Sequence, residues 1–305
     1  MFREYAVDPN VCSRNETCLH FFSSFSQSAG RLINKVPGDW ERKAIYALNK
    51  ASFLEDAPVD KARYKNKVKK IAKEVLLDDG SGIRFNEEED WLSKIQRSER
   101  LNEFAAVIGL SNDQDIRNLH SFEDLILNHP ELWEVPNEEI VSRNAADIVD
   151  VLEPLLKVSK EIVIVDPYFR ADRRFIQTTR EIISRREVYN FSRGIKNIRI
   201  NCEPPTVGEN FEGFQHWLTT EFQQYLPQGF EMEIKLWREK YLHDRWLLTN
   251  IGGLRIPIGF DEGKWDDDRE AEISRLSNDA RKKWLSRVSG SQEKPLHRFT
   301  ISAPE

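Results

Sequence analysis

One short apolar run constrains the fold more than any other segment of the chain. The letters EIVIV at 161–165 are β-branched and apolar, and the run stops at Asp166-Pro167. A strand that is buried on both faces of a sheet has this composition, because helices cover both of its sides. The run therefore predicts a central strand, with a turn at its carboxyl end.

The segments after this run change their hydrophobic period in turn. Helical and strand patterns follow one another, over 171–186, 197–202, 211–226 and 230–237. The segments YLHDRWLLT (241–249) and LRIPIGF (254–260) are predicted to be two further strands, joined by a tight turn at Gly252-Gly253. This order predicts an α/β domain over residues 141–305.

Residues 1–140 are predicted to form a separate and mostly helical domain. Helical spacing of apolar side chains runs through 39–53 and again through 121–135. A further helical pattern, which includes Ile140 and Val141, runs through 138–158 across the boundary to the second domain. The segment 59–77 places seven basic and two acidic residues around an apolar stripe, which predicts a basic amphipathic helix. A length of 305 residues also favours two domains over one.

The overall charge limits the binding partners. A formal net charge of −6 argues against a general electrostatic coat for nucleic acid or for anionic lipid. A local patch on the helix at 59–77 could still meet nucleic-acid phosphates, and a solvated charged face is the alternative reading of the same residues. The patch would consist of Lys65, Lys69, Lys70 and Lys73.

The cysteines and the apolar segments indicate the compartment. Three cysteines, an odd number, are not typical of a disulfide framework and favour a reducing environment. No run of about 18 apolar residues occurs, so we expect a cytoplasmic protein without a transmembrane segment. Cys12, Cys18 and His20 do not have a usual zinc-ligand spacing, so we expect neither a metal nor another cofactor.

The letters HDR at 243–245 carry the candidate chemistry. On the predicted strand, alternate side chains share a face, so His243 and Arg245 should point the same way. A neutral imidazole can attack phosphorus, and a guanidinium can hold two phosphate oxygens while charge develops. The pair therefore predicts phosphodiester chemistry. A structural ion pair with Asp166 or Asp261 is the alternative.

The pattern resembles the phospholipase D superfamily, which carries His-x-Lys, four residues and then Asp. This chain has His243, Arg245 and, after four further residues, Asn250. The letters VIVDPYF at 163–169 are similar to the opening strand of that superfamily and the Pro-Tyr-Phe-like turn that follows it. The resemblance implies a phospholipase D-like α/β sandwich half-unit, with His243, Arg245 and Asn250 as its catalytic residues.

A second resemblance is more specific and covers roughly residues 145–270. The segments at 165–170, 242–250 and 252–262 are similar in order and spacing to the phospholipase D-like C-terminal domain of microtubule-interacting-and-trafficking (MIT) domain proteins. That domain is regarded as non-catalytic. We expect the ligand-binding positions in these segments to be Asp166, Tyr168, Arg170, Asp261 and Glu262.

Several departures from the superfamily pattern bear on activity. Lys is replaced by Arg245, Asp by Asn250, and the usual Gly-Ser-x-Asn by the letters GFDE at 259–262. An arginine stays charged and cannot give up a proton, which favours binding over turnover. Catalysis in the superfamily also uses two facing histidines, and this chain has one such motif, so an active form would be a homodimer through this domain. A second histidine from the same chain, His216 or His297, is the alternative, although neither lies in a matching motif.

Two functions follow from these residues. The first is a metal-independent phosphodiesterase or nuclease that acts on nucleic acid, placed by analogy in a prokaryotic anti-phage defence system. The second is a non-catalytic module that binds a phosphate-bearing ligand or a partner protein, as a sensor or as a subunit of a defence complex.

Overall fold

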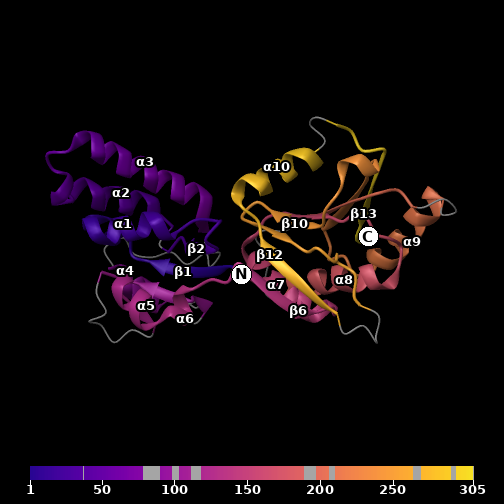
Figure 1. The fold of residues 1–305 in the computed structure, drawn as a ribbon, viewed down its shortest axis with the longest axis horizontal. Coiled ribbons are helices and arrows are strands. Elements are labelled where there is room, and N and C mark those ends of the chain that lie inside the picture. The colour runs from indigo at the N-terminus through magenta and orange to yellow at the C-terminus, as the bar shows by residue number, and fades with distance from the viewer. Residues whose placement is uncertain are drawn as a thin grey trace. The chain divides into compact units, whose positions relative to one another are not determined.

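The chain folds as a mixed α/β protein in two units, each with its own β-sheet (Figure 1). The computed structural model describes residues 1–36, 38–77, 90–97, 103–110, 118–188, 197–205, 210–263, 269–289 and 293–304. The N-terminal unit is Phe2–Pro136, and the C-terminal unit is Asn137–Glu305 together with Met1.

The N-terminal unit is built on a parallel sheet of five strands in the order β3-β2-β1-β4-β5. Its strands are β1 (Arg3–Val7), β2 (Arg31–Asn34), β3 (Leu76–Leu77), β4 (Ala106–Ile108) and β5 (Leu119–His120). The prediction of a mostly helical domain was therefore wrong in omitting a sheet. Strands of two to five residues are too short to show a period in the sequence.

Helices cover both faces of this parallel sheet, as its fully buried strand β4 requires. Tyr5 of β1 contacts Phe25 and Trp133 on one face, whereas the next residue, Ala6, packs with Trp91 and Ile95 on the other. The first face carries α1 (Asn15–Ser24), α2 (Trp40–Lys50), α3 (Pro58–Val75), α5 (Phe122–Asn128) and α6 (Pro130–Trp133), and the second carries α4 (Trp91–Gln96). The helices predicted over 39–53 and 59–77 are confirmed. The helix predicted over 121–135 is two helices, because Pro130 begins a new one.

The C-terminal unit has an eight-stranded mixed sheet in the order β13-β9-β8-β7-β10-β11-β12-β6. Three parallel strands form its middle: β7 (Ile162–Val165), β8 (Asn197–Cys202) and β9 (Glu231–Leu236). The remaining strands pair antiparallel: β10 (Trp246–Thr249), β11 (Gly253–Arg255), β12 (Glu270–Arg275), β6 (Glu138–Ser142) and β13 (His297–Ser302). The buried run at 161–165 is confirmed as a central strand.

Four helices pack around this sheet: α7 (Ala145–Val158), α8 (Arg173–Val188), α9 (Phe211–Gln223) and α10 (Asn278–Val288). On one face, Val163 and Leu248 share a core cluster with Val288 of α10. Successive side chains of a strand point to opposite faces, so Ile162 and Ile164 lie on the other face. None of the helices in the described residues has both the length and the apolar character needed to cross a lipid bilayer.

Candidate functional site

The sheet of the C-terminal unit brings several predicted residues to one edge. Strands β7, β8 and β9 are parallel, so their carboxyl ends meet there, and β10 is antiparallel to β7 and begins there. We call the residues that follow β7, β8 and β9 or directly precede β10 the carboxyl edge. Open α/β sheets bind their ligands outside this end of the strands.

Asp166 lies at the centre of the carboxyl edge and is completely buried. Its Oδ1 accepts a hydrogen bond from the Tyr168 backbone N–H at 2.9 Å, and its Oδ2 accepts one from the Phe260 N–H at 3.2 Å. Burial raises the pKa of Asp166 to about 6, against the opposing effects of these two hydrogen bonds and of Arg245. Asp166 thus joins the turn after β7 to the loop after β11.

Arg245 is fixed by contacts on several sides. Its Nη1 donates to the Pro257 carbonyl, its Nε lies 3.6 Å from Oδ1 of Asp166, and its guanidinium carbon lies 4.5 Å from the centroid of the Tyr168 ring. The side chain is still 26% exposed. The guanidinium is therefore held in one place at the carboxyl edge, with part of its surface open to solvent.

Gly259 allows these groups to come together. Its φ of +91° is in the left-handed region that favours glycine. A Cβ at this position would lie 3.1 Å from Arg245 Cδ, from Asp166 Oδ2 and from Asp261 Oδ1. The loop after β11 can approach Asp166 and Arg245 this closely only without a side chain at residue 259.

Asp261 and Glu262 have partners within the fold. Oδ2 of Asp261 accepts from Arg143 at 2.8 Å and from Arg174 at 3.4 Å. Oε1 of Glu262 accepts from the Ala145 N–H at 3.0 Å, at the first turn of α7. Both carboxylates thus hold the loop after β11 to the segments around α7 and α8.

His243 lies at the carboxyl edge but not on a strand. The short 3-10 helix Glu239–Tyr241 precedes it and β10 begins only at Trp246, so the strand predicted over 241–249 was too long. The chain must cross from β9 over β8 and β7 to reach β10, and residues before Trp246 make this crossing. The His243 side chain is exposed.

Glu203 is a residue of this edge that the sequence analysis missed. It directly follows β8, and burial raises its pKa, with a further contribution from Glu239. Arg170 and His243 shift the pKa of Glu203 in the opposite direction. A polar residue directly after a buried parallel strand was the signal that could have identified it.

Asn250 lies away from this edge, and the lysine patch belongs to the N-terminal unit. Asn250 follows the far end of β10, where its Oδ1 accepts from the Lys160 N–H at 2.7 Å. The structure therefore does not bring it to His243 and Arg245. The patch lies on α3 in the other unit, where Lys69, Lys70 and Lys73 are exposed and Lys65 is half-buried.

No family model matches the chain, and no characterised protein matches it at a significant level. The phospholipase D-like resemblance rests on the segments at 163–169, 242–250 and 252–262, and it stays a prediction.

Proposed function

We propose that the carboxyl edge binds phosphodiesters and that the protein is a phospholipase D-like phosphodiesterase acting on nucleic acid. The observation that carries this proposal is the exposed imidazole of His243, three residues before β10. The Arg245 guanidinium, directly before the same strand, is held in place by its contacts. An accessible nucleophile beside a fixed cation is the minimum arrangement for metal-independent attack on phosphorus. A prokaryotic anti-phage system is the setting we propose by analogy.

In this proposal a nitrogen of His243 attacks phosphorus, and the bond to the leaving oxygen breaks. The exposed part of the Arg245 guanidinium faces the negative charge that develops on the other phosphate oxygens. The leaving oxygen needs a proton. The Glu203 carboxyl group, in its protonated form, is one proposed source, and the second His243 of a homodimer is the other. Water then releases the phosphate from the histidine.

A specific observation favours a second candidate, recognition without turnover. Arg245 already uses one Nη1 hydrogen on the Pro257 carbonyl, and its Nε faces Asp166. A guanidinium that makes these two contacts has fewer N–H donors left to bind a transition state than a guanidinium without them. In this case the carboxyl edge binds a phosphate-bearing ligand or partner, and the chain acts as a sensor or assembly subunit.

Cleavage of labelled single- and double-stranded DNA and RNA, with EDTA present, tests the enzyme. The wild type is compared with His243→Ala and with His216→Ala, which alters an exposed histidine on α9. We expect at least a hundredfold loss of rate in His243→Ala and no change in His216→Ala. Equal loss in Glu203→Gln would assign the leaving-group acid to Glu203, and retained activity in that variant would assign it to a homodimer.

The absence of cleavage by the wild type would contradict the proposed enzymatic activity and leave recognition without turnover as the function to test. Binding of the same labelled oligonucleotides is then measured by fluorescence anisotropy. Weaker binding by His243→Ala than by His216→Ala would support recognition at the carboxyl edge. Equal binding by the two variants would exclude both functions for this edge.

A further inference from the structure

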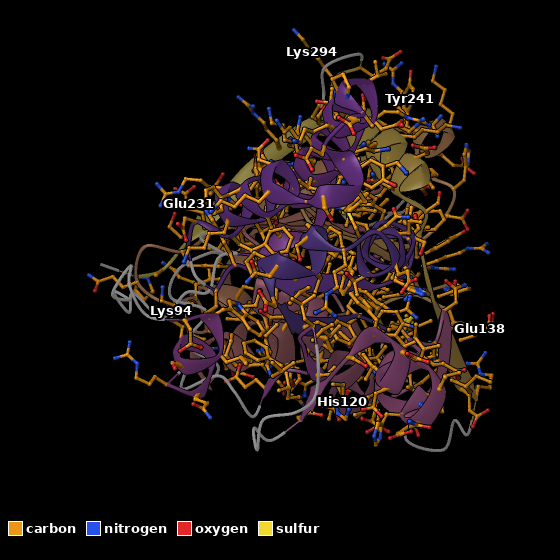
Figure 2. The ribbon with its side chains drawn as sticks, turned by 90° about the vertical axis from the view of Figure 1, so that its left-hand side faces the viewer. Lys94, His120, Glu138, Glu231, Tyr241 and Lys294 are labelled. Carbon is orange, nitrogen blue, oxygen red and sulfur yellow. The ribbon has the colours of Figure 1, made fainter. Side chains whose placement is uncertain are left out.

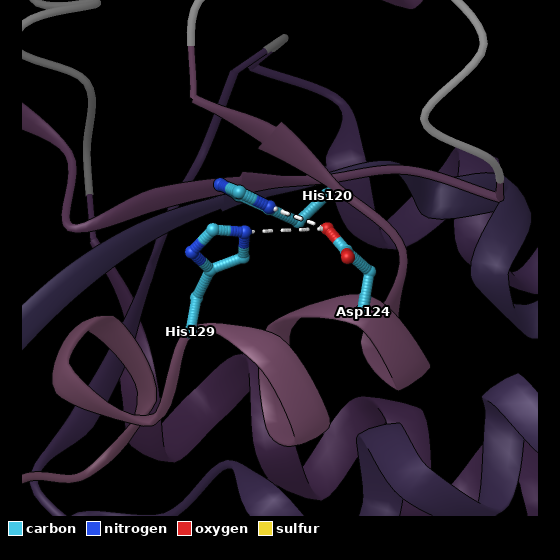
Figure 3. A group of neighbouring side chains, drawn as sticks. All are labelled: His120, Asp124 and His129. Atoms are coloured by element: carbon cyan, nitrogen blue, oxygen red, sulfur yellow. Dashed lines mark hydrogen bonds and ion pairs between the residues drawn. The ribbon is translucent and has the colours of Figure 1, made fainter.

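A second group of ionisable side chains converges in the N-terminal unit, at His120, Asp124 and His129 (Figure 3). Nδ1 of His120 lies 2.7 Å from Oδ2 of Asp124, and Nε2 of His129 lies 3.8 Å from the same oxygen. Each residue offers one ligand atom, and these atoms all lie within 4.8 Å of one another. Three potential metal ligands therefore face one small space.

The local fold explains this convergence. His120 ends β5, which is parallel to β4, so it lies at the carboxyl end of this sheet, where doubly wound folds bind ligands (Figure 2). Ser121 caps α5 by accepting from the Asp124 N–H at 3.1 Å, which puts Asp124 in the first turn. His129 lies between α5 and α6, before the helix that Pro130 starts.

Asn118 fixes which nitrogen of His120 faces this space. Its Nδ2 donates to the Phe104 carbonyl at 3.3 Å and to the Ala105 carbonyl at 2.9 Å. Its Oδ1 is therefore left to accept, and it lies 3.2 Å from Nε2 of His120. This contact favours the neutral tautomer with its hydrogen on Nε2, in which the lone pair of Nδ1 points at Asp124.

The other two groups are oriented in the same way. Asn128 donates to Oδ1 of Asp124 at 2.9 Å, which leaves Oδ2 facing the two imidazoles. Nδ1 of His129 lies 3.6 Å from Oε1 of Glu131, which favours the hydrogen on Nδ1 and the lone pair on Nε2. Each of the three groups thus has an outer partner on the atom that would not bind a metal, as metal ligands in proteins usually have.

This arrangement requires a positive charge in its centre. A nitrogen lone pair and a carboxylate oxygen at 2.7 Å repel each other unless a cation lies between them. A proton on Nδ1 can serve, and so can a divalent metal ion that also reaches Nε2 of His129. The three side chains are partly exposed, at 12%, 20% and 39%, so an ion can reach them from solvent.

We propose that Nδ1 of His120, Oδ2 of Asp124 and Nε2 of His129 bind one Zn²⁺ ion and leave its fourth position open. Two imidazoles and one carboxylate match the ligand preference of zinc, whereas Mg²⁺ and Ca²⁺ prefer oxygen alone. Zinc bonds of about 2.1 Å in a tetrahedron separate the ligand atoms by about 3.4 Å. To reach this geometry, the distance from His120 Nδ1 to Asp124 Oδ2 must lengthen from 2.7 Å and the distance from His129 Nε2 to the same oxygen must shorten from 3.8 Å. From the sequence we expected no metal, because the N-terminal cysteines and His20 are not arranged in a usual ligand spacing.

Titration of the full chain with Zn²⁺ by calorimetry, after chelator treatment and dialysis, tests the site. We expect one ion per chain, and Co²⁺ in its place should give the visible absorption of a four-coordinate ion. His129→Ala and Asp124→Asn should weaken Zn²⁺ binding at least a hundredfold. Asn128→Ala, which removes only an outer partner, should weaken it about tenfold to a hundredfold.

His216→Ala is the matched control, because it removes an exposed histidine from the other unit. It should leave the affinity and the stoichiometry unchanged. His129 is 39% exposed, so its replacement should preserve the circular dichroism spectrum. If Asp124→Asn does not fold, the Zn²⁺ affinity of His129→Ala alone decides the test. Absence of saturable binding by the wild type, or unchanged binding by His129→Ala, would overturn the proposal.

Discussion

At the scale of single residues, the buried carboxyl group of Asp166 links the protonation of the molecule to its stability. Burial raises its pKa to about 6, whereas aspartate in an unfolded chain titrates near pH 3.9. The folded state therefore binds this proton more tightly than the unfolded state. The resulting stabilisation is fully present below about pH 4 and is lost as the pH rises through about 6.

We predict that Asp166→Asn removes the contribution of residue 166 to the pH dependence of the unfolding free energy. Asparagine resembles the neutral acid and cannot titrate, so the difference in unfolding free energy between wild type and variant should change by about 2 kcal/mol between pH 4 and pH 7. Urea unfolding at several pH values measures this difference. Asp244→Asn, at a surface ion pair with Arg255, is the control. A constant difference across this range would contradict the expected burial effect.

At the scale of elements, the loop after β11 completes the carboxyl edge. It supplies the Pro257 carbonyl to Arg245 and the Phe260 N–H to Asp166, and it turns at Gly259 with a positive φ. Strands β7 and β10, which flank the site, do not by themselves hold Asp166 and Arg245 in these positions. The conformation of one glycine therefore sets the position of the guanidinium.

Gly259→Ala should destabilise the protein more than Gly229→Ala. Both glycines have positive φ, so both substitutions carry the backbone cost of about 1–2 kcal/mol. At Gly229 a Cβ would meet nothing within 4 Å, whereas at Gly259 it would crowd three side-chain atoms. Comparison of the two thermal unfolding midpoints isolates the crowding. Equal losses would show that the loop after β11 moves aside without cost.

The elements also show which parts of the fold were predictable. Strands β7, β8 and β9 have four to six residues with clear period or composition, and the sequence identified all three. The segment at 138–142 was assigned to a helix because Ile140 and Val141 fit a helical stripe. It is strand β6, and its pairing with β12 is a long-range contact that no local pattern records. The same limit applies to the five short strands of the N-terminal unit.

The candidate site was predictable to a similar extent. An ion pair of Arg245 with Asp166 was the structural alternative to the catalytic interpretation, and the two groups lie 3.6 Å apart. Asn250 was grouped with them by motif spacing alone, and the length of β10 separates it from them. His120, Asp124 and His129 were missed, because their grouping depends on the side-chain orientation that Asn118, Asn128 and Glu131 provide.

At the scale of the whole molecule, two sheets with separate hydrophobic cores predict two separable units. One core cluster includes Ala6, Trp91 and Val107, and another includes Val163, Trp237 and Trp246. We expect fragments 2–136 and 137–305 each to unfold cooperatively in calorimetry. At a hundredfold excess over its dissociation constant, Zn²⁺ should add about 3 kcal/mol to the first fragment and nothing to the second. A fragment without a cooperative transition would show that its core depends on the rest of the chain.

Strand β6 is synthesised long before β12, the only strand in the described residues that pairs with it. It pairs with β12, and their paired residues 138–142 and 270–274 are far apart in the sequence. At roughly 5–20 residues per second, a ribosome needs about 7–26 s to make the chain between them. An unpaired strand is a risk for aggregation during this time, but β6 begins with two glutamates and has no fully buried residue. Strand β6 begins at Glu138 (Figure 2) and is polar enough to stay solvated until β12 is synthesised.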